Sequence, residues 1–220
     1  MNAMDSTWTI LLAGDLRPTP RLRAQVAGSR VIAADAGIRH ATALGLQPEL
    51  WIGDFDSATE ALKEQFAHVP RQPHPADKDA TDGALAVAHA LANGAGRVML
   101  AGALHGRTDH ALAHLLQLAD LAERGVSAVA SSGREEAHGL IPGRRQRIDL
   151  PAGTPFSLLG FGPLRNVHVR NARWELSGED IPFASTRPLS NIAAGPVEIT
   201  IGAGPAVLLA RPAGNAVAGR

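Results

Sequence analysis

Two aspartates, one residue apart, directly follow a short apolar stretch. Asp54 and Asp56 come after Leu50–Ile52, which we expect to be a strand, and Gly53 allows a tight turn or close approach to a ligand. Crowded carboxylates repel each other unless a cation separates them. Mg²⁺ suits carboxylates and usually keeps waters and substrate phosphates as its other ligands. The pattern predicts a Mg²⁺ site; the alternative is an Asx-type turn in which Asp56 or Ser57 caps the next helix.

Three further groups of charged residues also follow predicted strands. They are Asp35, then Lys78 with Asp79 and Asp82, and finally Arg107 with Asp109 and His110. The carboxyl ends of parallel strands lie along one edge of a sheet, where open α/β sheets bind ligands. We therefore expect all four groups at one edge, which is hard to explain as four independent helix caps.

The group around Asp79 has a simpler alternative explanation. Asp79 can be the N-cap of a helix that runs to about Asn93, and Asp82, three residues later, mimics a capping box. Lys78 is unusual in such a cap, because a cation near a helix N-terminus opposes the helix dipole. A bound phosphate would remove that conflict, so capping and ligand binding both stay open.

The segment Gly102–Thr108 joins a predicted strand to a predicted helix. Its backbone N–H groups and the helix N-terminus can meet an anion, and Arg107 can bind the anion's oxygens. It is not a Walker A motif, because its spacing is one residue short and arginine replaces lysine.

His110 and His114 have the spacing of a helical zinc pair, but Ala111 stands where a metallohydrolase has glutamate, so we favour a structural or phosphate-contacting His110.

Composition limits the class of protein. The 220 residues carry 21 Lys and Arg against 21 Asp and Glu, so no net charge attracts nucleic acid or an acidic membrane. Cysteine is absent, which excludes disulfides and thiolate metal sites. No apolar run approaches the roughly 20 residues of a membrane span, and no signal-peptide pattern is present. The motifs of serine hydrolases and dinucleotide-binding oxidoreductases are missing. We expect a cytoplasmic protein that binds neither nucleic acid nor membrane.

Strands and helices alternate over the first 130 residues, which predicts a mostly parallel sheet covered by helices. After Gly133, short β-type runs separated by Gly and Pro indicate a small β-sandwich or barrel. These runs are 144–148, 156–159, 167–170, 173–176, 197–201 and 206–209. The predicted fold is an N-terminal α/β domain of residues 1–133 with a mostly parallel sheet, followed by a small all-β, sandwich-like C-terminal domain of residues 134–220.

Two predicted helices have apolar residues at helical spacing. The expected buried faces are Leu85, Ala88, Leu91 and Ala92 in the helix before Asn93, and Leu112, Leu115, Leu116 and Ala119 in the helix that ends near Arg124. Trp8 and Trp51 lie in predicted strands of the α/β domain, so we expect both in its core.

In their order and spacing, these segments resemble the thiamine pyrophosphokinase family from about residue 8 to residue 211. The matching segments are Ala34–Gly37, Pro48–Ser57, Lys78–Asp82, Gly102–His110, Gly139–Pro142, Trp174–Leu176 and Leu189–Asn191. One departure is Asp35-Ala36-Gly37, where the family usually has Asp-Gly-Gly. Another is the segment with Gly102-Ala103 and His105, where the family usually has paired glycines and a small residue.

The resemblance implies that the chain transfers the pyrophosphoryl group of ATP to thiamine, giving thiamine diphosphate and AMP. It also implies a homodimer with active sites at its interface, an α/β domain that binds ATP and Mg²⁺, and a β domain that contributes to thiamine binding and dimerisation. The implied Mg²⁺ ligands are Asp54, Asp56 and Asp79, with Asp35 nearby, and Lys78 and Arg107 are the other implied catalytic residues. The implied ATP-binding residues are Asp35, Gly37, Thr81, Asp82, Gly102, Gly106, Arg107, Thr108, Asp109 and His110.

Trp174, Ser190 and Asn191 are the thiamine-binding residues that the resemblance implies. Trp174 lies between Arg173 and Glu175, which is an odd place for a core residue. The pyrimidine and the cationic thiazolium of thiamine both suit the face of an indole ring. The alternative is that Trp174 fills the interior of the β domain.

Two other functions stay open. One is a pyrophosphokinase that acts on a pterin alcohol, which would use the same aspartate-rich edge, although Trp174 and Ser190-Asn191 favour thiamine. The other is a nucleotide- or thiamine-binding regulator without turnover, which the intact set of aspartates disfavours.

Overall fold

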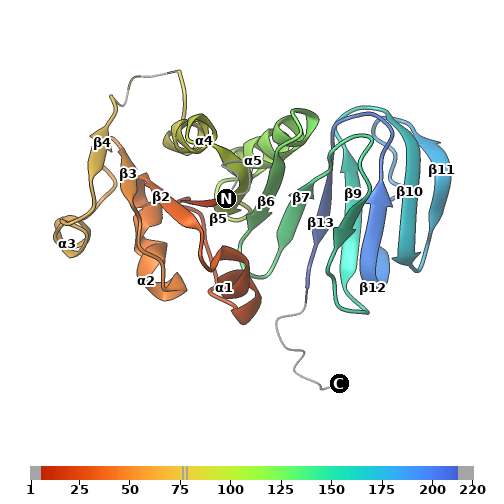
Figure 1. Ribbon diagram of the computed structural model, residues 1–220, viewed down its shortest axis with the longest axis horizontal. Coiled ribbons are helices and arrows are strands. Elements are labelled where there is room, and N and C mark those ends of the chain that lie inside the picture. Colours follow the sequence, from red (N-terminus) through yellow and green to blue (C-terminus); the bar gives the residue numbers. More distant parts are fainter. Residues whose placement is uncertain (1–5, 76, 78, 213–220) are drawn as a thin grey trace. The chain divides into compact units, whose positions relative to one another are not determined.

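The computed structural model describes residues 6–75, 77 and 79–212 (Figure 1). Contacts between residues divide the chain into two compact units. Unit 1 contains the residues up to Thr108 together with Ser131–Gly133, and unit 2 contains Asp109–Ala130 and the residues from Arg134 on. The chain passes between the units at 133/134, where the sequence predicts a boundary, but also at 108/109 and 130/131, so the helix after Thr108 groups with unit 2.

Unit 1 is built on five parallel strands, as predicted. They are β1 (Ser6–Leu11), β2 (Arg30–Ala34), β3 (Leu50–Gly53), β4 (Arg71–Pro73) and β5 (Ala95–Ala101). Their order in the sheet is β5-β1-β2-β3-β4, and each neighbouring pair is parallel. Because all five run in one direction, the loops that follow them lie at a single edge of the sheet, which we call the strand-end edge.

The face of the sheet on which each helix of unit 1 lies follows from this strand order. The helices are α1 (Pro20–Val26), a 3₁₀ helix (Asp35–His40), α2 (Ala41–Leu44), α3 (Glu60–Gln65) and α4 (Asp82–Ala92). Right-handed crossovers place the connections of β1 to β4 on one face of the sheet and the return through α4 on the other. Figure 1 shows α4 opposite α1 and α2. The N-cap of α4 is Thr81, whose side chain accepts from Ala84 N, so the alternative in which Asp79 caps this helix is wrong.

Trp8 and Trp51 are fully buried, as expected for core residues of this sheet. The predicted helix faces are wrong in part. Helix α4 buries Ala86, Val87 and Ala90. Helix α5 (Thr108–Glu123) buries Leu118, Ala119, Leu121 and Ala122, whereas Leu112 and Leu116 are exposed. Both helices carry alanine or leucine on several faces, so periodicity alone selected the wrong one.

Unit 2 contains most of α5 and strands β6 to β13. The strands are β6 (Ser127–Ser131), β7 (Glu136–Gly139), β8 (Gln146–Ile148), β9 (Pro155–Gly160), β10 (Leu164–Ala172), β11 (Leu176–Ile181), β12 (Asn191–Thr200) and β13 (Ala206–Ala210). Their order is β11-β10-β12-β9-β13-β7-β6, with β8 beside β12. The pairs among β7 to β13 are antiparallel, and their inward side chains form an aliphatic core.

One predicted strand of unit 2 is a turn instead. Residues 173–175 bend between β10 and β11. The carboxylate of Glu175 holds this turn by accepting from Asn171 N at 2.8 Å and from Arg170 Nη1 at 3.0 Å. Asn171 adopts a left-handed φ of 59°, which asparagine tolerates better than most residues. Strand β7 was not predicted. No helix in the described residues is long and apolar enough to cross a membrane.

Candidate active site

Three carboxylates meet at the strand-end edge of unit 1. Asp35 follows β2, and Asp54 and Asp56 follow β3. One carboxylate oxygen from each lies within 4.8 Å of those of the other two. Within the described residues, the predicted pair is therefore joined by Asp35, and Asp79 is not part of this carboxylate group.

Short polar contacts hold the carboxylate group in place. Ser57 Oγ donates to Asp35 Oδ2 at 2.5 Å, and Asp56 N donates to Asp54 Oδ1 at 3.2 Å. Asp35 Oδ1 is enclosed and has no hydrogen-bond partner. An enclosed carboxylate oxygen without a donor is unfavourable unless something positive reaches it. Three carboxylates with converging oxygens, one of them exposed, fit a hard cation such as Mg²⁺.

The electrostatics of the carboxylate group favour a proton or a cation. The pKa of Asp56 is raised above its ordinary 3.8, first by a side-chain hydrogen bond with Asp54, then by the negative charge of Asp54, with smaller effects of desolvation and of the charge of Asp35. The ionised form of Asp56 is therefore disfavoured in the folded protein, and a bound cation would reverse that preference.

We predict that Asp56→Asn does not destabilise the metal-free protein at neutral pH. Because the folded state raises the pKa of Asp56, it binds the proton more tightly than the unfolded chain, and wild-type stability falls as pH rises from about 3.8 through the raised value. Asparagine does not titrate, so the variant should gain relative to wild type across that window. Urea unfolding in EDTA from pH 4 to 8 measures the difference, and a variant that loses stability relative to wild type as pH rises would contradict it.

The loop after β5 lies at the same edge. Gly102 and Gly106 have φ values of +86° and +108°, and Arg107 is the last residue before α5. An added Cβ on Gly14, in the loop after β1, would overlap the carbonyl oxygens of Gly102 and His105. The loops after β1 and β5 therefore touch backbone to backbone, which only glycine at position 14 allows.

The loop after β1 was not singled out in the sequence. Arg39 donates to the carbonyl of Ala13, and His40 Nε2 donates to Gly14 O at 2.9 Å. Burial lowers the pKa of His40 and the bond to Gly14 opposes this effect, so the environment as a whole favours the neutral ring. The available signal was Gly14, which lies shortly after the first strand.

The remaining residues that were predicted to bind ATP lie in several different elements of the structure. Gly37 lies against β1, where an added Cβ would overlap Leu11 O, so packing alone requires glycine there. Asp79 is exposed in the loop before α4, Thr81 caps that helix, and Asp82 begins it. Lys78 lies outside the described residues. Thr108, Asp109 and His110 form the first turn of α5, and His110 is edge-on to His114 at 6.3 Å between ring centroids.

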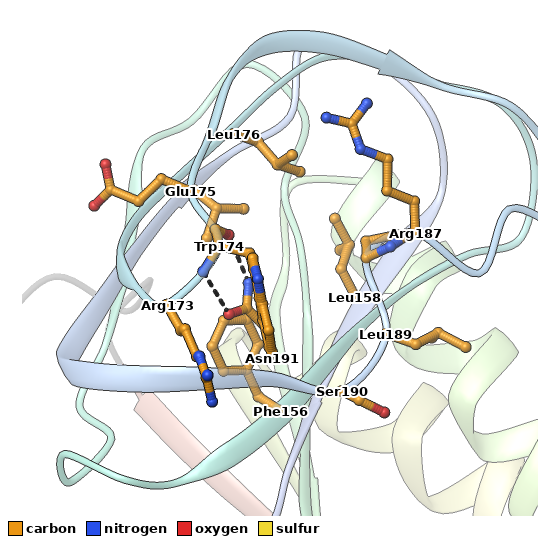
Figure 2. A pocket seen from close by; sticks show the side chains of 12 residues that line it. Phe156, Leu158, Arg173, Trp174, Glu175, Leu176, Arg187, Leu189, Ser190 and Asn191 are labelled. Atoms are coloured by element: carbon orange, nitrogen blue, oxygen red, sulfur yellow. Dashed lines mark hydrogen bonds between the residues drawn. The ribbon is translucent and has the colours of Figure 1, made fainter.

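The predicted thiamine-binding residues line one pocket in unit 2 (Figure 2). This pocket has a volume of about 560 Å³ and lies between the turn at Trp174 and the segment Arg187–Asn191, with Phe156 and Leu158 of β9 in its wall. Trp174 is 53% exposed, so the alternative that it fills the core is wrong. The guanidinium of Arg173 lies 4.8 Å from the centroid of the Trp174 ring.

Asn191 fixes the backbone of Trp174. Its Oδ1 accepts from Trp174 N at 3.1 Å and its Nδ2 donates to Trp174 O at 2.7 Å, as the dashed lines in Figure 2 show. The same Oδ1 accepts from Ile192 N at 2.8 Å. Asn191 is only 6% exposed. This geometry indicates a role in holding Trp174 more than direct contact with a ligand, whereas Ser190 is exposed at the pocket.

We predict that Asn191→Asp displaces Trp174. A carboxylate still accepts from Trp174 N but cannot donate to Trp174 O, and that lost bond costs about 1 kcal/mol or more. Because Trp8 and Trp51 are buried, a shift in the tryptophan emission of the variant would report on Trp174. The difference spectrum should vanish when the change is made in a Trp174→Phe background. An unchanged spectrum in the single variant would contradict the prediction.

Comparison with known proteins finds one family that part of this chain resembles. Residues 25–130 match the family model described as "Thiamin pyrophosphokinase, catalytic domain". This segment contains the carboxylate group and the loop Gly102–Thr108. The predicted resemblance to the thiamine pyrophosphokinase family is confirmed.

Solved structures show the same fold. A thiamine pyrophosphokinase from Bacillus subtilis is 20% identical, with a TM-score of 0.80 over 94% of this chain and 99% of its own. The enzyme from Geobacillus thermodenitrificans is 19% identical, with a TM-score of 0.76 over 96% and 98%. The yeast thiamin pyrophosphokinase is 15% identical, with a TM-score of 0.75 over 97% and 88%. A comparison with curated proteins found no match.

Proposed function

We propose that this protein is a thiamine pyrophosphokinase, which transfers the pyrophosphoryl group of ATP to the hydroxyethyl oxygen of thiamine. The observation that carries the proposal is the carboxylate group. Asp35, Asp54 and Asp56 converge at the strand-end edge, inside the segment that matches the catalytic-domain family. A new bond forms between the thiamine oxygen and the β-phosphorus, the bond from that phosphorus to AMP breaks, and the hydroxyl proton is released.

The carboxylate group would hold Mg²⁺. Bound there, Mg²⁺ would supply positive charge against the phosphates of ATP as they react. Asp35 Oδ1, which has no hydrogen-bond partner, is a free ligand atom for it. Asp79, in the loop before α4, remains a proposed further ligand. Phosphoryl-type transfer asks a protein mainly for positioning and charge stabilisation, and both suit this edge.

The strand-end edge would bind the triphosphate. In this proposal Gly102 and Gly106 let the backbone approach the phosphates, and Arg107 binds their oxygens. Asp35, Gly37, Thr81, Asp82, Thr108, Asp109 and His110 complete the proposed ATP site. Lys78 is a proposed second cation near the phosphates.

The pocket in unit 2 would bind thiamine, with Trp174 stacking on its rings and Ser190 at its border. Asn191 would act by holding Trp174. We further propose that residues 1–133 form the catalytic α/β domain and residues 134–220 a β-sandwich domain, and that the active protein is a cytoplasmic homodimer.

The test is a product assay with ATP, Mg²⁺ and thiamine. We expect thiamine diphosphate and AMP in equal amounts, and no AMP when thiamine is left out. Asp54→Asn should lower turnover, because the loss of a metal ligand costs on the order of several kcal/mol of transition-state stabilisation. The circular dichroism spectrum of the variant should match that of the wild type. AMP release that does not depend on thiamine, or that needs a pterin alcohol instead, would refute the proposal.

Arg107→Lys should weaken ATP use strongly. Lysine keeps the charge but lacks the planar fork that binds two phosphate oxygens at once. We expect the KM for ATP to rise and turnover to fall, with the KM for thiamine unchanged. Arg124→Lys, on an exposed arginine that pairs with Asp120 on α5, is a matched control that should keep wild-type kinetics. Wild-type kinetics in Arg107→Lys would exclude a bidentate phosphate contact.

Trp174→Ala should weaken thiamine binding and spare ATP binding. A cation over a tryptophan face is worth roughly 0.5–2 kcal/mol. Because the Trp174 side chain is largely exposed, its loss should cost little stability, in contrast to the roughly 3–5 kcal/mol of a buried tryptophan. Calorimetric titration with thiamine and thermal melting measure both effects. Unaltered thiamine affinity in the variant would remove Trp174 from the site.

A further inference from the structure

The buried indole of Trp51 contacts both chain segments that carry the carboxylate group. Its Nε1 donates to the backbone carbonyl of Asp35 at 2.8 Å. Its ring packs edge-on against Phe55, with centroids 5.0 Å apart and planes at 84°. Phe55 lies between Asp54 and Asp56 in the chain, so one side chain touches the backbone of the first carboxylate residue and the spacer between the other two.

Both contacts fall on residues in left-handed backbone conformations. Asp35 has a φ of +46° and Phe55 a φ of +63°. Such conformations persist only where the surroundings hold them, and an aromatic residue enters them reluctantly. The Phe55 ring supplies an anchor, and the guanidinium of Arg71, 5.0 Å from the Trp51 centroid and 5.9 Å from that of Phe55, borders both rings.

We propose that Trp51 is a positioning residue for the cation site, and this inference rests on the proposed Mg²⁺ role of the carboxylate group. The indole N–H fixes Asp35 at the end of β2, and the ring fixes the turn at Phe55 after β3. Without the two contacts, mutual repulsion would separate Asp35 from Asp54 and Asp56. A cation would then meet the carboxylates one at a time.

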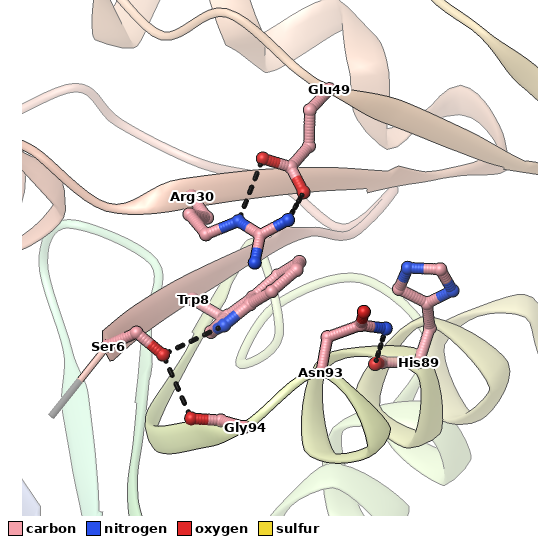
Figure 3. Close-up of polar contacts among 7 residues, drawn as sticks. All are labelled: Ser6, Trp8, Arg30, Glu49, His89, Asn93 and Gly94. Carbon is pink, nitrogen blue, oxygen red and sulfur yellow. Dashed lines mark hydrogen bonds and ion pairs between the residues drawn. The ribbon is translucent and has the colours of Figure 1, made fainter. Parts of the chain in front are cut away.

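Trp8 offers a matched control in the same sheet (Figure 3). Like Trp51, it is fully buried, lies beside an arginine, with Arg30 3.8 Å from its ring centroid, and uses its Nε1, which donates to Ser6 Oγ at 3.2 Å. Trp8 pairs with Arg30 at the start of β2, whereas Asp35 follows the end of that strand. Arg30 and Asp35 are five positions apart along the strand, or roughly 16 Å.

The experiment compares Trp51→Phe with Trp8→Phe in the full chain. Each variant loses an indole N–H and a similar volume from the core of unit 1, so both should melt at lower temperature. Binding of Mn²⁺, used in place of Mg²⁺, is measured by electron paramagnetic resonance without ATP or thiamine. We expect Trp51→Phe to bind Mn²⁺ on the order of tenfold more weakly, as for the loss of an outer-shell partner of a metal ligand, and Trp8→Phe to bind it like wild type.

Two results would overturn the proposal: equal Mn²⁺ affinity in Trp51→Phe and wild type, or equal weakening in both variants. A wild-type protein that binds no Mn²⁺ would overturn it together with the metal site. Pyrophosphate transfer is read separately, from thiamine-dependent AMP release, so failure of this inference leaves that assay unaffected.

A second pair of variants applies if Trp51→Phe does not fold. Phe55→Gly suits the left-handed φ and removes the ring, so it should fold yet bind Mn²⁺ as weakly as expected for Trp51→Phe. Ala184→Gly, at an exposed residue of unit 2 with a φ of +61°, is its control and should bind like wild type. Full Mn²⁺ affinity in Phe55→Gly would also refute the proposal.

Discussion

Repulsion among three carboxylates is the constraint that the strand-end edge of unit 1 must satisfy. Asp35, Asp54 and Asp56 crowd into one place, and the pKa of Asp56 is raised in response. Nothing in this crowding stabilises the fold by itself, so neighbouring groups must hold the carboxylates together. Ser57 does so by donating to Asp35, and the rigid register of β2 against β3 fixes the two segments that carry them. A protein that keeps such a group assembled is ready for a cation without rearranging its backbone.

Close backbone contacts make the same edge compact enough for a small ligand. An added Cβ on Gly53 would lie 3.2 Å from Asp35 Cα, which is tighter than side chains ordinarily tolerate. Gly37 meets the end of β1, and Gly14 meets the loop after β5. At these glycines, the segments that follow β1, β2, β3 and β5 approach one another closely through their backbones. Arg107, proposed to bind phosphate at this edge, is an exposed residue of the loop after β5.

The sequence predicted the parallel sheet well, because β1, β2, β3 and β5 each contain a short apolar run, whereas β4 (Arg-Gln-Pro) does not. It also predicted the aspartate pair, whose two members are close in the chain. It placed Asp35 only nearby and favoured Asp79, since contact between the ends of β2 and β3 depends on strand order. The faces of α4 and α5 were misassigned because alanine and leucine occur all round these helices, and packing partners decide which side is buried. The turn at Trp174 was mistaken for a strand because Asn191, which bonds to the backbone of Trp174, is distant in the chain.

Ala36 stands where the thiamine pyrophosphokinase family usually has glycine, and the structure shows how alanine fits at this position. A glycine at that position would suggest that the turn after β2 needs a left-handed residue there. In this chain the positive φ falls on Asp35, and Ala36 is not among the residues with positive φ. Aspartate enters the left-handed region more readily than most residues. Asp35 thus supplies both the backbone conformation of the turn and a carboxylate of the proposed cation site, while Gly37, which lacks a Cβ, leaves room for the backbone of β1. With those two demands met on either side of it, Ala36 can be an ordinary buried residue.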